Sequence, residues 1–328
     1  MKRIFAILMV LTLMGATAVF AEGQGESAAE KPFPSKPVNM IVGYNPGGGT
    51  DTPARALAAA APEFMNNQPL IVVNKPGASG MLGPKFVAEQ KADGYTLLMG
   101  WGNTEFTFNR HVRELPIKVF DDFEPVMAVI KYSSCIAVPT SSPIKSLDDF
   151  VAAAKDNPGK LQWTHTGVGG EHYVNALDFF DRAGIELTEV PNTGGVKTRN
   201  LVAGEHVDVA VFATFLAAGF EDKVRVIAIF TDDPNHMFPD VKTANEQGYE
   251  SINAYAIKCI AAPAGTPKER IDILYDSMKK ALEHPAAQKI MKQNNFTPLG
   301  WGPDETLKAV KDLDAKYKAL IDKLGLAK

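Results

Sequence analysis

The residues of this chain best suited to chemistry lie in two glycine-rich turns, residues 43–51 (GYNPGGGTD) and residues 164–172 (THTGVGGEH). Each turn follows a short apolar run and leads into a helix-like stretch. Glycine lets backbone N–H groups approach a bound group closely, and a helix N-terminus offers unsatisfied donors and a partial positive charge. We therefore expect these turns to bind an anionic group, either a carboxylate or a phosphate.

Further turns stand at comparable positions. Residues 191–196 (PNTGGV) repeat the second design at the next strand, and residues 100–105 (GWGNTE) follow the third strand. In doubly wound sheets the first and third strands often flank the point where the chain order reverses, so residues 100–105 should lie beside residues 43–51. Residues 74–80 (NKPGASG) come one strand further away and are expected to be mainly structural, whereas Thr214 follows a strand that ends on an apolar platform.

These turns lack the motifs of common enzymes and cofactor sites. Residues 43–51 match neither the G-x-G-x-x-G dinucleotide pattern nor the G-x-x-x-x-G-K-[ST] nucleotide pattern. His165, Glu171 and His172 do not have the H-E-x-x-H spacing, and Ser79 lacks the G-x-S-x-G spacing of a serine nucleophile. We expect no catalytic residue, no metal and no cofactor. A metal-binding receptor that uses His165 and His172 is kept as an alternative.

The elements that carry the turns alternate between strands and helices. Expected strands are 38–42, 70–73, 95–99, 135–138, 161–163, 188–190, 207–212, 224–230 and 255–261, and expected helices are 53–65, 82–90, 147–155, 173–183, 196–203, 268–282 and 304–324. Such alternation with short links is typical of an α/β protein with parallel sheets and right-handed crossovers. Asp51 and Arg55, four residues apart, should pair on the first helix.

We predict two lobes, each a mainly parallel doubly wound sheet, joined by two crossover strands. Lobe 1 would comprise residues 35–132 and 258–328, with the last helices covering it, and lobe 2 would comprise residues 133–257. A single large doubly wound sheet is the alternative. If the crossings are adjacent antiparallel strands, Cys135 and Cys259 could face each other across the hinge. The sequence leaves a disulfide open, because bridging requires close and correctly aimed Cβ atoms.

The N-terminus predicts export from the cytoplasm. Lys2 and Arg3 precede a mostly apolar run, and small residues follow up to Ala21, so we expect a signal peptide over residues 1–21 that is cleaved after Ala21. The run is short for the about 20 apolar residues of a membrane-spanning helix, and a permanent anchor is the alternative. Residues 22–34 have the composition of a flexible linker.

The charge of the chain argues against nucleic-acid binding. Its 34 Lys and Arg stand against 38 Asp and Glu, for a formal net charge of −4, and removal of the signal would make the charge more negative by two. Nothing resembles the basic stripe of a nucleic-acid-binding protein.

Several motifs, taken together, resemble one family: the extracytoplasmic solute receptors of tripartite tricarboxylate transporters, also called the Bug or TctC family. They include residues 46–51 (PGGGTD), 73–80 (VNKPGASG), 93–98 (DGYTLL), 201–208 (LVAGEHVD), 238–243 (FPDVKT) and 262–267 (APAGTP), in the family's order and over nearly the whole mature chain. The resemblance implies a monomeric periplasmic binding protein of type II-like fold, a "Venus flytrap" that closes on a small carboxylate. It also implies delivery of that ligand to a large and a small integral membrane protein.

The turns and the resemblance together predict a set of ligand-binding residues. In lobe 1 the set is Tyr44, Gly48, Gly49, Thr50, Asp51, Asn103 and Thr104, and in lobe 2 it is His165, Thr166, Gly167, Gly170, His172, Thr193, Gly194, Gly195 and Thr214. The resemblance implies that main-chain amides and ordered waters hold the carboxylate. The ligand would be a mono- to tricarboxylate or an amino-dicarboxylate, but relatives often have a Tyr and a Lys where this chain has Asn192 and Thr193, which makes substrate identity by analogy unsafe. A receptor that signals to a sensor kinase and an enzyme of carboxylate metabolism are the alternatives.

Overall fold

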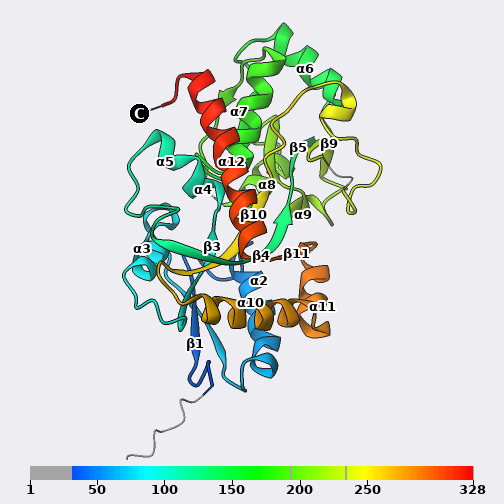
Figure 1. The fold of residues 1–328 in the computed structure, drawn as a ribbon. Coiled ribbons are helices and arrows are strands. Elements are labelled where there is room, and N and C mark those ends of the chain that lie inside the picture. Colours follow the sequence, from blue (N-terminus) through cyan, green and yellow to red (C-terminus); the bar gives the residue numbers. More distant parts are fainter. Residues whose placement is uncertain (1–31, 193, 233–234, 328) are drawn as a thin grey trace, which may run out of the picture.

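The chain forms two lobes, each built around its own β-sheet (Figure 1). The computed structural model describes residues 32–192, 194–232 and 235–327, so the predicted signal peptide and most of the predicted linker lie outside the described residues. One sheet has six strands in the order β11-β4-β10-β3-β1-β2, and the other has five in the order β7-β6-β8-β5-β9. The α/β two-lobe fold is confirmed, and the alternative of one large sheet is wrong.

The six-stranded sheet takes its strands from both ends of the described chain. They are β1 (Val38–Val42), β2 (Leu70–Asn74), β3 (Thr96–Trp101), β4 (Phe123–Tyr132), β10 (Ala256–Pro263) and β11 (Thr297–Trp301). The pairings β1–β2 and β1–β3 are parallel, whereas β3–β10, β4–β10 and β4–β11 are antiparallel. The prediction of a mainly parallel sheet is therefore wrong, and the sheet is mixed, because the strands that run to and from the other lobe add antiparallel neighbours to a parallel core.

Helices cover both faces of this sheet. They are α2 (Asp51–Ala60), α3 (Leu82–Ala88), α4 (Thr104–Thr107), α5 (Asn109–Val112), α10 (Lys268–Glu283), α11 (Pro285–Gln293) and α12 (Pro303–Leu324), with short 3₁₀ turns at Ala61–Phe64 and Ala78–Gly80. Side chains of β1 alternate between the faces: Met40 packs in the cluster with α2, α10 and α11, and Ile41 packs in the cluster with α3, α4 and α12. The last helices thus pack on the six-stranded sheet.

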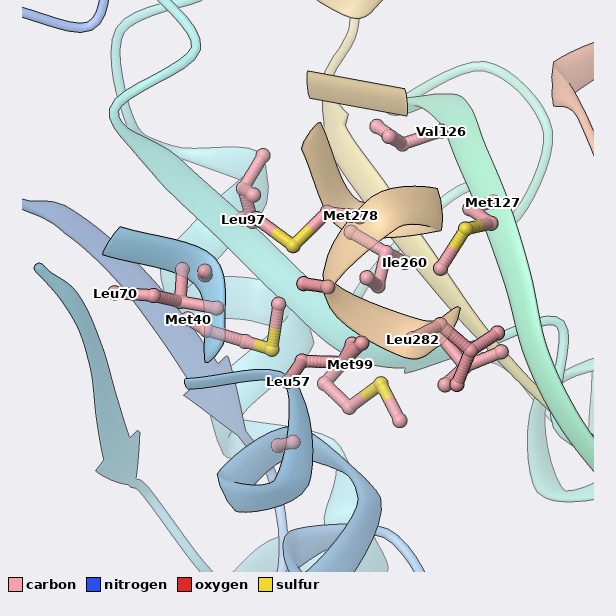
Figure 2. Packing of buried hydrophobic residues seen from close by; sticks show 14 of the residues in the cluster. Met40, Leu57, Leu70, Leu97, Met99, Val126, Met127, Ile260, Met278 and Leu282 are labelled. Carbon is pink, nitrogen blue, oxygen red and sulfur yellow. The ribbon is translucent and has the colours of Figure 1, made fainter. Parts of the chain in front are cut away.

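The first of these clusters is rich in methionine (Figure 2). Met40 and Met99 of the sheet, Leu57 of α2 and Met278 of α10 point into one apolar interior. Unbranched methionine side chains adapt to irregular gaps between elements. This interior holds α2 against the sheet and so sets where the first turn of α2 lies.

The five-stranded sheet lies in lobe 2. Its strands are β5 (Ser134–Pro139), β6 (Gln162–His165), β7 (Thr188–Glu189), β8 (Val209–Ala213) and β9 (Val224–Phe230). Its helices are α6 (Leu147–Asp156), α7 (Glu171–Ala183), α8 (Gly195–Ala203) and α9 (Thr214–Ala217), and a 3₁₀ turn follows at Asn245–Gln247. The pairings β6–β7 and β6–β8 are parallel and those of β5 with β8 and β9 are antiparallel, so this sheet is also mixed.

Two adjacent crossings join the lobes. The chain leaves lobe 1 between Tyr132 and Ser134 and returns before Ala256, whose partner across the β4–β10 ladder is Tyr132. Cys135 already belongs to the lobe 2 sheet, opposite Phe212, whereas Cys259 belongs to the lobe 1 sheet. Both cysteines are buried and free, so the two thiols do not face each other across the hinge.

Most predicted elements are present within a few residues, but β4, β11, α4, α5, α9 and α11 are not among the strands and helices expected above. Pro125 interrupts the apolar pattern of β4, and Pro298 and Gly300 interrupt that of β11. Proline in a strand is tolerated at an edge, and β11 is an edge strand of its sheet. Among the described residues, every helix is too short or too polar to cross a bilayer.

Candidate functional site

The first and third strands place their loops side by side, as predicted. β1 and β3 pair in parallel, and the Asn103 side-chain amide donates to the Tyr44 hydroxyl oxygen at 3.4 Å. Asn103 is fully buried. β2 lies on the other side of β1, so residues 74–80 come one strand further away, and Asn74 there bonds to the backbone oxygen of Tyr44 at 3.0 Å.

Asp51 organises the first glycine turn. Its carboxylate accepts from the Gly47 N–H, the Arg55 Nε–H and the Asn74 side-chain amide, each at 2.8 Å. Burial would raise the pKa of Asp51, yet these donors together hold it below its usual value. The predicted Asp51–Arg55 pair is confirmed. Because its oxygens are occupied by the protein's own donors, Asp51 shapes the turn, and a ligand role for it stays a prediction.

The turn leaves the start of α2 without a side-chain cap. Thr50 stands at the N-cap position and makes no side-chain capping bond, while Gly48 is exposed. A Cβ placed on Gly49 would lie 3.6 Å from the Tyr132 hydroxyl and 3.7 Å from Phe215 Cζ. Phe215 belongs to α9 of lobe 2. The two lobes therefore meet at the glycine turn, next to the start of α2. Within the first turn of this helix the Thr52 N–H donates to the Gly48 carbonyl, and Pro53 has no N–H.

His165 organises the turn of lobe 2. Its imidazole accepts from the Gly167 N–H at 3.0 Å on one side and contacts the Glu189 carboxylate at 3.0 Å on the other. The side chain is fully buried, which fits a positioning role better than direct contact with a solute. The Gly194 N–H bonds to the Thr166 carbonyl at 2.8 Å, so the turns before α7 and α8 are tied together.

The helices of these turns also begin without side-chain caps. Gly170 precedes α7 and Gly194 precedes α8, and neither helix receives a side-chain capping bond. Helices α3, α10 and α12 also lack a side-chain cap, whereas Ser146 and Asp149 form a complete capping box at α6. Thr193 lies outside the described residues.

Two threonines of the predicted set bond within the protein. The Thr104 hydroxyl pairs with Tyr317 of α12 at 3.1 Å, and Thr214 packs against Ser133 through its backbone and side chain. Both are buried. The structure brings their turns to the lobe boundary, but it gives their hydroxyls structural partners.

His172 lies at the hinge. Its Nδ1 is 2.6 Å from the Ser134 hydroxyl, and its Nε2 is 3.3 Å from a Glu171 oxygen. Burial lowers the pKa of His172 to about 4, so the ring is neutral near neutral pH. The ring also stacks on Tyr132, the last residue of β4.

Sequence reasoning missed a buried charged cluster at the lobe boundary. It consists of Glu105 of α4, Glu171 of α7 and Lys258 of β10, with the hydroxyls of Tyr44 and Tyr132 beside them. The Tyr132 hydroxyl hydrogen-bonds to Glu171. Burial raises the pKa of Glu105, against the opposing charge of Lys258. The available signals were Glu105 inside the turn after β3 and a lone lysine in the apolar strand β10.

A separate surface cavity of about 440 Å³ lies where the end of α12 meets lobe 2. Trp163, Phe180 and Leu324 contribute to its lining, and the glycine turns do not. In Figure 1, α12 runs from lobe 1 alongside α7.

Comparisons with known proteins identify the family. Residues 53–326 match the model of the tripartite tricarboxylate transporter family receptor, TctC. The chain belongs to this family. Protein BugT of Bordetella pertussis is 28% identical over 322 residues, which cover 97% of each chain.

Solved structures of TctC and Bug proteins have the same fold. The periplasmic binding protein BugD superposes with a TM-score of 0.78 at 27% identity, covering 90% of this chain and 100% of that chain. MatC of Rhodopseudomonas palustris, solved with bound malate, has a TM-score of 0.76 at 24% identity, covering 88% of this chain and 100% of that chain. The protein is thus a TctC-family solute receptor with two lobes.

Proposed function

We propose that this protein is an extracytoplasmic receptor that captures a small organic carboxylate between its lobes. It would then deliver the ligand to a tripartite tricarboxylate-type transporter made of a large and a small membrane protein. One observation carries the proposal: glycine-rich turns of both lobes begin helices that have no side-chain cap, and these turns meet at the lobe boundary. Free N–H groups at helix starts attract anions.

Lobe closure supplies the mechanism. A ligand that contacts both lobes stabilises the closed arrangement by its difference in affinity between closed and open states. The ladder between Tyr132 and Ala256 leaves a short two-stranded connection about which the lobes would rotate. The predicted signal peptide would place the receptor in the periplasm, where BugD is described to act.

The first test identifies the ligand. Mass spectrometry of solute released from the denatured protein should detect a small carboxylate, and that compound should raise the melting temperature of protein stripped of ligand. A ligand at one hundred times its Kd stabilises the folded state by about 2.7 kcal/mol.

The second test examines the amide cradle with Gly48→Val. A Cβ on Gly48 meets only the Asn45 carbonyl oxygen, at 3.8 Å, so the fold should tolerate the change while the branched side chain blocks the start of α2. Gly48→Ala is the matched control and should keep most of the ligand response. Gly195→Val should also reduce the response, but its Cβ would come 2.3 Å from Leu216 Cδ1, so its folding must be checked. A full response in both valine variants would refute the amide cradle.

A further inference from the structure

Two acceptor atoms at the lobe boundary lack a donor. Asn103 Oδ1 and Glu105 Oε2 are buried and have no hydrogen-bond partner among the described residues. Among the described residues only four side-chain atoms are buried without a partner. One of the other two is Asn192 Oδ1, in the turn before α8. A buried acceptor without a partner is unfavourable and uncommon in folded proteins, so these atoms point to a donor supplied by a ligand.

Several donors at the lobe boundary are already used, and the remaining one, the Lys258 ammonium group, faces both Glu105 and Glu171. The Asn103 amide donates to Tyr44, the Tyr132 hydroxyl bonds to Glu171, and the amide of Asn175 serves Ser134 and the Ala254 carbonyl. The cluster also contains two carboxylates against one ammonium group, that of Lys258. With His172 neutral, this part of the cleft has an excess of acceptors and of negative charge.

We propose that Glu105 and Asn103 bind a protonated nitrogen of the solute, so that this receptor selects an amino-carboxylate over the matching plain carboxylate. The inference rests on the proposed function and names the class of solute more narrowly. The glycine turns would hold the carboxylate, and the turn after β3 would hold the ammonium group. A charge-assisted hydrogen bond to a buried carboxylate is among the stronger polar contacts in proteins.

The position of Glu105 ties this selection to closure. Its Oε1 lies 3.8 Å from the place a Cβ would take on Gly170, at the start of α7 in lobe 2. Glu105 itself belongs to lobe 1. An ammonium group bound there is enclosed by both lobes, so it favours the closed state.

The test uses matched pairs of acids that differ only by an amino group. The pairs are propionate and alanine, succinate and aspartate, glutarate and glutamate, and hexanoate and norleucine, each titrated by calorimetry into full-length mature protein stripped of ligand. The best-bound amino acid should bind at least about tenfold tighter than its partner, which corresponds to about 1.4 kcal/mol. Glu105→Gln keeps the size of the side chain and should reduce that ratio at least about tenfold.

The controls separate the inference from the proposed function. Glu283→Gln, at an exposed position on α10, should leave the ratio unchanged. If plain acids bind as tightly as their amino partners, or if Glu105→Gln keeps the ratio, the inference is wrong and the proposed function stands. If no compound of the panel binds, the solute released from the denatured protein decides: a plain carboxylate overturns the inference alone, and the absence of any carboxylate overturns both. Circular dichroism and the melting temperature confirm that each variant is folded.

Proton exchange on binding gives an independent readout. Glu105 faces Lys258, Glu171 and the hydroxyls of Tyr44, Tyr132 and Tyr317. Its pKa is raised in the free protein by burial, and a bound ammonium group would lower it, so binding should release protons on the acid side of neutrality. Titrations in buffers of different ionisation enthalpy should show this release in the wild type and lose it in Glu105→Gln. Proton uptake would overturn the inference, because it would mean that a protonated Glu105 donates to a ligand carboxylate.

Discussion

Replacement of Asp51 by alanine should destabilise lobe 1, because one carboxylate supports the whole glycine turn. The Asp51 side chain is 1% exposed and accepts three hydrogen bonds, from Gly47, Arg55 and Asn74. Asp51→Ala removes the acceptor of the Gly47 N–H and one of the two acceptors of the Asn74 amide, which still donates to the Tyr44 backbone oxygen. The Arg55 side chain is 50% exposed and can turn to water.

The size of the loss follows from these three bonds. Hydrogen bonds to a charged acceptor contribute about 1.5–3 kcal/mol each when buried, and water entering beside Arg55 will restore part of that. An exposed ion pair at i,i+4 adds only about 0.3–0.5 kcal/mol. We expect Asp51→Ala to lower the free energy of unfolding by about 3 kcal/mol and Arg55→Gln to lower it by less than about 1 kcal/mol.

The assay must report on lobe 1 alone, since two lobes need not unfold together. In a Trp163→Phe background the remaining tryptophans are Trp101 and Trp301, in β3 and β11 of the lobe 1 sheet. Urea unfolding followed by their fluorescence then compares Asp51→Ala, Asp51→Asn and Arg55→Gln. Asp51→Asn keeps one acceptor and should lie between the other two.

A loss below about 1 kcal/mol for Asp51→Ala would refute the reasoning, because it would equal the contribution of the exposed pair alone. The pH dependence supplies a second check. The pKa of Asp51 is lower in the folded state than its usual value of 3.8, so its contribution is present above that value and is lost as pH falls through the lower, folded pKa. Asp51→Asn should remove this part of the acid sensitivity.

Three more outcomes are expected. Asn175→Leu should lower the free energy of unfolding by about 2–4 kcal/mol in urea titrations. The reason is that the buried side-chain amide of Asn175 bonds to both the N–H and the carbonyl of Ala254. A loss below about 1 kcal/mol would contradict this prediction. Cys135 and Cys259 should resist a thiol reagent in the native protein, because both are buried and burial raises the pKa of both thiols. In urea without reductant the reagent should detect two free thiols per chain, and a count below two would show a disulfide. Burial lowers the pKa of His172 from 6.5 to about 4. The free energy of unfolding should therefore fall as the pH drops from 6.5 to about 4, because in that range the unfolded state binds a proton that the folded state does not. His172→Gln should reduce this loss of stability, and an unchanged pH profile of stability would refute this effect of His172.

The sequence by itself determined the α/β class, most strands and helices, and the family. Those features are local: apolar runs such as residues 38–42, glycine turns such as residues 43–51, and short motifs in a fixed order. It also predicted that the loops after β1 and β3 would lie together, because parallel strands at a switch point bring their carboxyl ends to one edge. The strands β4 and β11 escaped prediction because prolines break their patterns.

Only the tertiary structure decided which side chains face the cleft. Asp51 and His165 bond to groups of the protein itself, and their contact with a ligand stays a prediction. Glu105, Glu171 and Lys258 come together from three elements far apart in the chain. Cys135 and Cys259 were separated in the same way, because strand pairing assigns them to different sheets. Burial and partner choice depend on long-range packing, which the spacing of residues along the chain does not encode.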